Sequence, residues 1–234
     1  MTSEKTRKTI LDAFMDLVTE KPWPDVTMAE VAERAKVKPS ALRKTYDGRM
    51  AILADYFRRI DAEVLDGSDP DLAEEGAVDR LFDVLMRRLD ALEEHKSALR
   101  ALARAARRDP VLAAELNSLA LTSQRWMLTA AGITVSGLGG LALTQALVVA
   151  FLRVLKVWFK DEDPGQAATM AALDRELKRG AGIMERIDRA ERWCRPLKRA
   201  FSQARSRRER NGAASAGDAA PDAGSSAPDA SAPA

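Results

Sequence analysis

The densest group of side chains that could bind another molecule lies between Arg34 and Arg49. This segment contains six basic residues and one acidic residue, Asp47. Lysine and arginine bind phosphate, and arginine also pairs with the edge of guanine. Because the whole chain carries a net charge of only +2, this local concentration indicates an anion-binding surface. The basic residues are Arg34, Lys36, Lys38, Arg43, Lys44 and Arg49.

Two short helices separated by a turn are predicted to position these residues. Thr27-Met28-Ala29-Glu30 has the spacing of a capping box, which starts a helix by pairing two side chains with free backbone amides. Pro39 suits the first position of the next helix, since no backbone donor is needed there. Leu42 and Tyr46 share one side of that helix and are expected to face inward. A helix, a turn and a helix at this spacing are typical of a helix-turn-helix.

A helix-turn-helix places its second helix in the major groove of DNA, where the first turns contact base edges. The helix that Pro39 opens presents basic and small residues on its outer side. Thr27 begins the preceding helix, where a hydroxyl and free amides can hold a phosphate. We therefore expect double-stranded DNA as a partner. The residues expected to contact it are Thr27, Lys36, Lys38, Ser40, Ala41, Arg43, Lys44 and Arg49.

The rest of the chain predicts an all-α protein, because helix-forming residues dominate and apolar residues recur with helical period. Residues 126–152 contain no charged residue and are long enough to span a bilayer. Glycine and serine near their middle instead predict a loop at about 131–138 between two buried helices. Helices are expected over Leu138–Phe159, buried on most sides, and over Pro164–Lys178.

The composition also predicts how the chain is divided. Residues 1–48 are expected to form a helix-turn-helix domain, and residues 49–204 a helical domain for ligand binding and dimerisation. Residues 205–234 are expected to be a disordered tail, since 20 of the last 24 residues are Ala, Pro, Gly or Ser.

The N-terminal residues resemble the TetR family of transcriptional regulators over about residues 4–55. The resemblance lies in Thr6–Phe14, Val26–Ala35, Val37 and Ser40–Leu42. Several positions depart from the family pattern. Lys36 stands where glycine is usual, Lys38 replaces a Ser or Thr cap, and Arg43 replaces a tyrosine. The usual phenylalanine is Tyr46, and the usual lysine at the start of the fourth helix is Arg49.

The resemblance implies a ligand-responsive regulator, most simply a repressor, that acts as a homodimer. TetR-like proteins pair through their last long helices into a four-helix bundle, a role that Leu138–Phe159 and Pro164–Lys178 fit. The two recognition helices of such a dimer lie about 34–36 Å apart and match a palindromic operator. The effector would bind among the middle helices. Few ionisable groups lie there, so we expect a small apolar effector, contacted by Phe82, Met86, Leu102, Leu119, Trp126 and Met127.

A second resemblance gives an alternative function. Trp158–Pro164 and Ala171–Leu177 are similar to the end of the lipid-binding accessory proteins of ubiquinone biosynthesis. Those proteins share the TetR-like fold but are not repressors, and they contact membranes through a C-terminal amphipathic helix. In this chain, apolar residues between Ile183 and Phe201 alternate with Arg and Lys. That segment fits a weak membrane contact or packing on the dimer equally well. The basic recognition helix favours the regulator.

Catalysis is not expected. His95 is the one histidine and lies among charged residues, so we expect it to be solvated. The sequence lacks a Ser/His/Asp set, a Cys/His metal cluster and a glycine-rich phosphate loop, so no cofactor or metal is predicted. Cys194 is the single cysteine and is interpreted as a packing residue. The polar N-terminal residues indicate no signal peptide, and a cytoplasmic location is expected.

Overall fold

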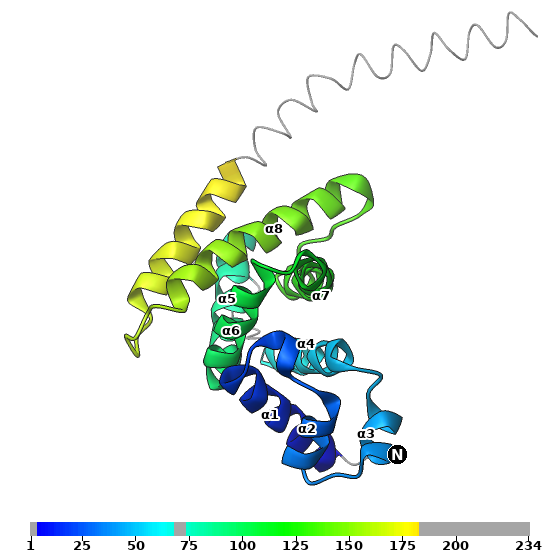
Figure 1. The fold of residues 1–234 in the computed structure, drawn as a ribbon. Helices are drawn as coiled ribbons and strands as arrows, with labels where there is room; N and C mark the ends of the chain where they lie inside the picture. The colour runs from blue at the N-terminus through cyan, green and yellow to red at the C-terminus, as the bar shows by residue number, and fades with distance from the viewer. Residues whose placement is uncertain (1–3, 68–73, 183–234) are drawn as a thin grey trace, which may run out of the picture. The chain divides into compact units, whose positions relative to one another are not determined.

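Every regular element that the computed structural model describes is a helix, which confirms the all-α prediction (Figure 1). The described residues are 4–67 and 74–182. The elements are α1 (Glu4–Glu20), the 3-10 helix η1 (Trp23–Asp25), α2 (Met28–Arg34), α3 (Pro39–Thr45), α4 (Arg49–Asp66), α5 (Ala77–Leu92), the 3-10 helix η3 (Glu93–His95), α6 (Lys96–Ala106), α7 (Pro110–Ala130), α8 (Gly137–Trp158) and a last helix over residues 167–182.

The first helix, α1, buries its apolar face against α2 and α6. Ile10 and Phe14 are fully buried on that face, and the ring of Phe14 meets the ring of Trp23 edge to face at 6.3 Å. Pro22 and Pro24 flank Trp23, and the α-helix ends before them because proline lacks the backbone donor that a helix interior needs. The chain then turns through η1 into α2.

The predicted capping box is present at the start of α2. The backbone N–H of Glu30 donates to Oγ1 of Thr27 at 3.3 Å, and the backbone N–H of Thr27 donates to Oε2 of Glu30 at 3.1 Å. Pro39 occupies the first position of α3, as predicted. The turn between the two helices requires Lys36 to adopt a positive φ of 54°. Glycine adopts that conformation without strain, whereas a lysine side chain does not.

The long helix α4 packs on α5 and α7, and α7 in turn packs on α8. The core that these helices share is continuous with the core beneath α1 and α2. Leu53, Leu85, Met127 and Trp158, which come from four different helices, are all fully buried in it. The helix-turn-helix is therefore supported directly by the larger helical body.

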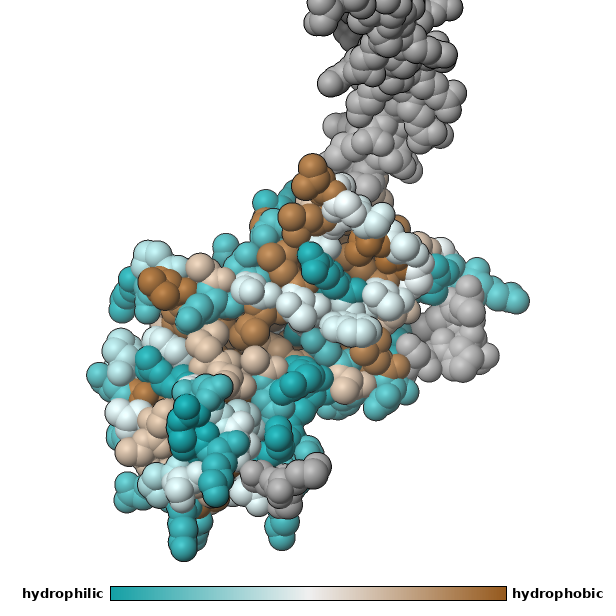
Figure 2. Space-filling model, turned by 90° about the vertical axis from the view of Figure 1, so that its right-hand side faces the viewer, coloured by the Kyte–Doolittle hydropathy of each residue, from teal (hydrophilic) through white to brown (hydrophobic). Residues whose placement is uncertain are grey.

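A loop separates α7 from α8, as predicted from the glycine and serine residues near 131–138. The expectation that the following helix is buried on most sides is wrong for the single chain. Its outer face exposes Leu138, Leu141, Val149 and Leu152 to solvent. Hydrophobic surface gathers in the part of the molecule that holds α8 and the helix of residues 167–182, whereas the end that holds α1 to α3 is mainly hydrophilic (Figure 2).

By length and composition alone, α8 is apolar enough to cross a membrane. The core helix of a water-soluble protein meets the same criteria, and α8 packs on α7 and buries Leu147, Val148 and Phe151.

The last described helix begins at residue 167, not at Pro164 as predicted. Pro164 and Gly165 form a turn instead, and the Asp163 side chain accepts hydrogen bonds from the backbone N–H groups of Gly165 and Ala167 at 3.1 and 3.3 Å. Asp161 accepts a further bond from the backbone of Thr169 at 2.9 Å. Carboxylates at these positions satisfy the free amides that begin a helix, which explains the later start.

The described residues up to 182 belong to one compact unit. Within it α1 contacts α6, so the predicted helix-turn-helix domain is packed against the rest. The predicted boundary at residue 48 stays a prediction. The end of the second predicted domain, Cys194, the basic amphipathic segment and the tail 205–234 lie outside the described residues.

Candidate functional site

The outer side of α3 is exposed and basic. Ser40, Arg43 and Lys44 are exposed, whereas Leu42 and Tyr46 are buried with only 2% and 4% of their surface accessible. The helix lies at the end of the molecule remote from α8 (Figure 1). The structure therefore confirms which side of α3 faces inward and leaves its basic side accessible to a large partner.

Three lysines around α3 have side-chain amines without a partner in the part of the chain that the structure describes. They are Lys36 in the turn, Lys38 at the N-cap and Lys44 in the last turn, and all three are exposed. Arg43 forms an ion pair with Asp47, one helical turn away, and 72% of its side chain remains accessible. An exposed pair of this kind contributes little to stability, so a phosphate can replace Asp47 at low cost. Four cations are thus available on one surface, which we call the α3 basic face: Lys36, Lys38, Arg43 and Lys44.

Arg49 serves the structure of the protein as well as any partner. Its guanidinium donates hydrogen bonds to the carbonyl oxygens of Trp23 and Val26, the second at 3.2 Å. The same group lies 4.3 Å from the centre of the Trp23 ring, in a cation–π contact. Arg49 therefore holds η1 against the start of α4. Its contact with a DNA phosphate stays a prediction.

Thr27 is similarly engaged at the start of α2. Its hydroxyl donates to Oε2 of Glu30 at 3.0 Å, and Glu30 also pairs with Lys21. The hydrogen bond from Lys21, together with those from Thr27, lowers the pKa of Glu30 from 4.5 to about 2. A carboxylate therefore occupies this helix start at neutral pH, and an incoming phosphate would have to compete with it. The predicted phosphate contact of Thr27 stays a prediction.

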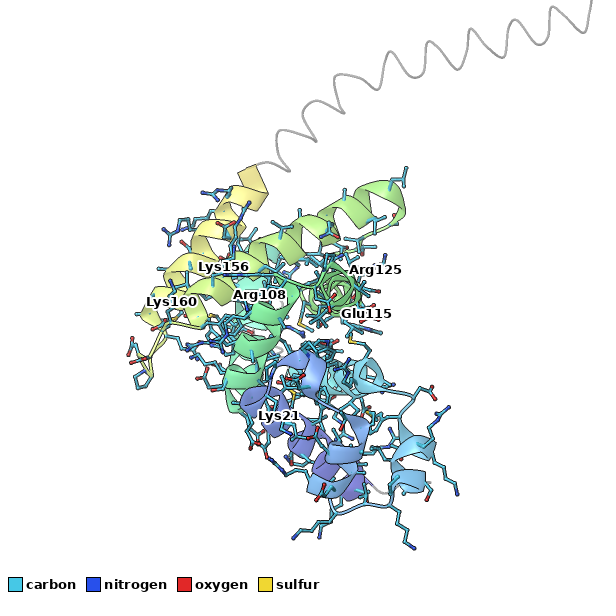
Figure 3. All side chains as sticks on the ribbon, in the orientation of Figure 1. Lys21, Arg108, Glu115, Arg125, Lys156 and Lys160 are labelled. Carbon is cyan, nitrogen blue, oxygen red and sulfur yellow. The ribbon has the colours of Figure 1, made fainter. Side chains whose placement is uncertain are left out.

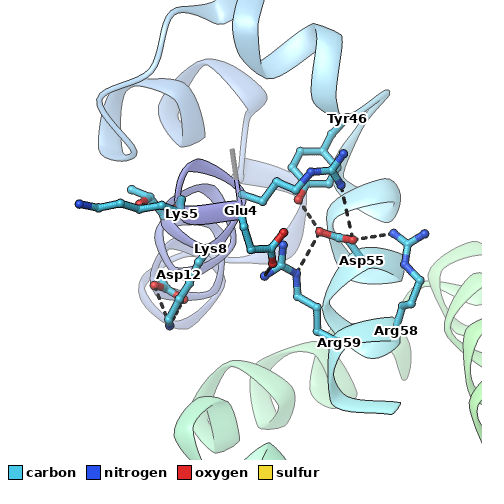
Figure 4. Close-up of polar contacts among 10 residues, drawn as sticks. Glu4, Lys5, Lys8, Asp12, Tyr46, Asp55, Arg58 and Arg59 are labelled. Carbon is cyan, nitrogen blue, oxygen red and sulfur yellow. Dashed lines mark hydrogen bonds and ion pairs between the residues drawn. The ribbon is translucent and has the colours of Figure 1, made fainter. Parts of the chain in front are cut away.

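A buried polar cluster fixes the C-terminal end of α3 to α4 (Figure 4). The phenol of Tyr46 donates a hydrogen bond of 2.6 Å to Oδ2 of Asp55. Arg58 donates to Oδ1 of the same carboxylate at 2.5 Å, and Arg59 donates to Oδ2 at 3.2 Å. Arg7 of α1 lies 3.8 Å from Oδ1. Asp55 thus joins three helices through one carboxylate, although only 4% of its surface is accessible.

The environment of this carboxylate keeps it ionised. Burial by itself raises the pKa of Asp55, but the hydrogen bonds from Tyr46 and Arg58 and the charge of Arg59 outweigh burial and lower the pKa. Burial and the bond to Asp55 raise the pKa of Tyr46. The pair therefore consists of a neutral phenol and a carboxylate at physiological pH, which gives a charge-assisted hydrogen bond.

The sequence prediction missed Asp55, although a signal was present. Asp55 follows Ile52 by three residues and precedes Tyr56, so it lies on the inward face of an amphipathic helix. An acidic residue at such a position requires a buried partner. The same reasoning applies to Asp61 and Arg88, which pair with each other in the core beneath α7.

A cavity of about 770 Å³ lies between α6, α7 and α8, with contributions from α4 and α5. Of the six residues predicted to contact an effector, Leu102 lines it. Met127 is fully buried in the core, Trp126 is half exposed on α7, and the others are partly buried. These five do not line this cavity, so their contact with an effector stays a prediction.

His95 is not solvated as expected. Only 13% of its side chain is accessible, and its ring meets the ring of Tyr56 edge to face at 5.3 Å. The charged neighbours Glu93 and Glu94 lead to the prediction that His95 is exposed to solvent. In the structure, η3 places the histidine ring against α4. His95 is therefore partly buried and packs against α4.

Comparison with known proteins finds one short sequence similarity and several structural ones. No family model matches the chain. A curated relative, the HTH-type transcriptional regulator YdeS of Bacillus subtilis, is 41% identical over 54 residues. This match covers 23% of the present chain and 27% of the relative. The similarity is therefore strong in one short segment and does not extend to the remaining length.

Solved structures match most of the chain. A TetR transcriptional regulator from Nitrosomonas europaea matches with a TM-score of 0.61 and 20% identity, covering 76% of this chain and 99% of that one. A putative TetR-family regulator from Rhodococcus sp. matches with a TM-score of 0.52 and 18% identity, covering 74% of this chain and all of its own. The chain has the fold of the TetR-family transcriptional regulators. The helix, turn and helix that the sequence predicts within residues 4–55 are α2 and α3 of this fold.

Proposed function

We propose that this protein is a cytoplasmic transcriptional regulator that binds a palindromic operator as a homodimer and is released from it by an effector. The observation that carries the proposal is the α3 basic face, in which Lys36, Lys38 and Lys44 have no partner among residues 4–67 and 74–182. Unpaired cations on a protruding second helix of a helix-turn-helix fit the phosphates and base edges of a major groove. The TetR fold and the curated regulator support this reading.

The outer face of α8 supports the dimer. Leu138 is 86% exposed, Leu141 44% and Leu152 49% in the single chain. Met170, in the helix of residues 167–182, is also exposed, at 38%. Apolar side chains on two adjacent helices lose contact with water when a second copy packs on them. A two-fold pair of these helices makes the four-helix bundle that the resemblance implies.

Binding to DNA from upstream of the protein's own gene tests the proposal, with fluorescence anisotropy measured at several salt concentrations. Replacing Arg43 and Lys44 together by alanine should weaken binding and reduce the slope of log affinity against log salt by roughly 2, since each lost phosphate contact removes about one counterion. Arg125→Gln is the matched control, because Arg125 is exposed on α7, remote from α3 (Figure 3). Unchanged binding in the double variant, with the control also unchanged, would show that α3 is not the recognition helix.

The alternative is a lipid-binding protein with the same fold that contacts membranes through its C-terminal segment. The cavity of about 770 Å³ and the apolar face of α8 are the observations in its favour. Flotation of the full chain with anionic vesicles separates the two functions. Tight vesicle binding together with no salt-sensitive DNA binding would favour the alternative.

A further inference from the structure

The walls of the cavity between α6, α7 and α8 are apolar. Leu99 and Leu102 line it from α6, Leu116 lines it from α7, and Val148 and Phe151 line it from α8. A volume of about 770 Å³ lies within the range of sites that enclose a small organic molecule. Most of the wall can therefore accept only an apolar body.

Two buried polar side chains line the cavity at what we call its inner end, and each has one atom without a hydrogen-bond partner in the described part of the chain. Arg88 is 3% exposed and Gln124 is 2% exposed, and both line the cavity. Nε of Arg88 and Oε1 of Gln124 have no partner within the described part of the chain. The charge of Arg88 is already balanced by Asp61, which also accepts a hydrogen bond from Ser123. Burial lowers the pKa of Arg88, while the carboxylate of Asp61 opposes that change. The inner end thus offers polar atoms but little net charge.

The mouth of the cavity, unlike its inner end, carries a strong positive charge. Five exposed cations line it, which we call the basic rim: Arg100, Arg104, Arg107, Lys156 and Lys160. None of the five side chains pairs with any residue in the two described stretches, and no carboxylate lines the cavity. Some exposed cations elsewhere, such as Arg34 and Arg153, have carboxylate partners, whereas the lysines of the α3 basic face do not. Lys156 lies in the last turn of α8, and Lys160 lies just after that helix ends (Figure 3).

We propose that the cavity binds an anionic amphiphile, with its apolar chain along the leucine and phenylalanine walls and its negative head group at the basic rim. Five unpaired cations beside an apolar enclosure favour a ligand that carries both features, because the head group stays near water while the chain leaves it. Carboxylate and phosphate head groups share this chemistry. The role of the ligand as effector depends on the proposed regulator function, but its binding to the cavity does not.

This proposal revises the apolar effector expected from the sequence. The residues that the sequence indicated lie mainly on α5 and α7, and of these two helices only α7 has few ionisable side chains. The cavity instead draws its rim from α6 and the end of α8. The ligand expected from the structure still has an apolar chain, but it also has a negative head group.

Calorimetry of the full chain with dodecanoate and dodecyl phosphate below their micelle concentrations, and with dodecanol below its solubility limit, tests the proposal without DNA. The two anions should bind, the alcohol should bind at least about tenfold more weakly, and added salt should reduce the difference. The preferred anion identifies the head group. Equal affinity for dodecanoate and dodecanol, or no binding of any probe, would overturn the proposal.

Paired variants assign the binding to this cavity. Arg104→Gln combined with Lys156→Gln should weaken dodecanoate by about tenfold and leave dodecanol unchanged, since two exposed ion pairs are lost. Arg125→Gln, on α7 outside the cavity, should change neither. Ala120→Trp fills the cavity from α7 and should weaken all three probes. Unchanged dodecanoate binding in the charge variant would overturn the proposal even if the tryptophan variant failed to fold.

The same measurements distinguish failure of this proposal from failure of the proposed function. Dodecanoate binding with no DNA binding would support the proposed ligand of the cavity and exclude the proposed regulator function. DNA binding with equal affinities for dodecanoate and dodecanol would support the regulator function and exclude an anionic ligand in the cavity. If the chain binds DNA and also prefers dodecanoate to dodecanol, saturating dodecanoate should lower its affinity for DNA. DNA should then lower its affinity for dodecanoate by the same factor.

Discussion

The phenol oxygen of Tyr46 lies 2.6 Å from Oδ2 of Asp55, and this hydrogen bond connects the end of α3 to α4. The carboxylate is shared with Arg58 and Arg59 of α4, so the position of α3 depends on a cluster that is anchored in the larger helical body. An effector that moved α4 would move α3 through this bond. The cluster is therefore a physical connection between the DNA-binding helices and the rest of the chain.

Removing the phenol hydroxyl should destabilise the protein. Tyr46→Phe leaves a buried carboxylate with one partner fewer, and we expect a loss of about 1.5–3 kcal/mol in the free energy of unfolding by urea. Tyr56→Phe is the matched control, because the Tyr56 hydroxyl is buried and has no hydrogen-bond partner among the described residues. It should be neutral or slightly stabilising. Equal effects of the two substitutions would mean that the Tyr46–Asp55 bond contributes nothing.

Lys36 should show opposite effects on stability and on DNA binding. Its φ of 54° strains a lysine, so Lys36→Gly should raise the free energy of unfolding by roughly 0.5–1 kcal/mol, after the greater flexibility of glycine in the unfolded chain is allowed for. The substitution also removes a cation of the α3 basic face, so the salt slope of DNA binding should fall by about 1.

A second substitution at the same position separates these two effects. Lys36→Ala removes the charge but keeps a β-carbon at positive φ, so it should reduce the salt slope as glycine does and should not raise stability. If alanine stabilised the protein as much as glycine, the strain argument would fail.

The capping box of α2 should make stability depend on pH between about 5 and 2. Hydrogen bonds from Lys21 and Thr27 lower the pKa of Glu30 from 4.5 in the unfolded chain to about 2 in the folded protein. Its contribution is therefore complete above the unfolded pKa and is lost as the pH falls towards the folded pKa.

Glu30→Gln measures that contribution. Glutamine can keep the hydrogen bonds of the capping box but cannot pair with Lys21 as a charge. Thermal melts of the variant and the original chain should therefore differ most near pH 6 and converge towards pH 2. A difference that stayed constant over this range would show that the charge of Glu30 is not what stabilises the start of α2.

A charge on the outer face of α8 should dissociate the dimer. Val149 is 40% exposed in the single chain, and Val149→Asp would place a carboxylate in the apolar contact between copies. Sedimentation velocity should then show a monomer, and operator affinity should fall with it. Val111→Asp is the control, because Val111 is 68% exposed on α7. A dimer that survives the first substitution, with the control also dimeric, would exclude this face as the interface.

The local elements could be predicted from the sequence because short-range physics decides them. The Thr27–Glu30 capping box, Pro39 at the start of α3 and the loop before α8 each depend on residues within a few positions of one another. The inward side of α3 followed from helical spacing in the same way, since Leu42 and Tyr46 are four residues apart.

Contacts between distant residues depended on the tertiary structure. Spacing cannot show that Arg49 binds the carbonyl groups of η1, that Asp55 receives Tyr46, or that His95 packs on Tyr56. The cavity is the clearest case, because its rim combines α6 with the end of α8. Helical periodicity identifies which side of each helix is apolar, but only the packing of several helices decides which of those sides meet and where an unfilled space remains between them.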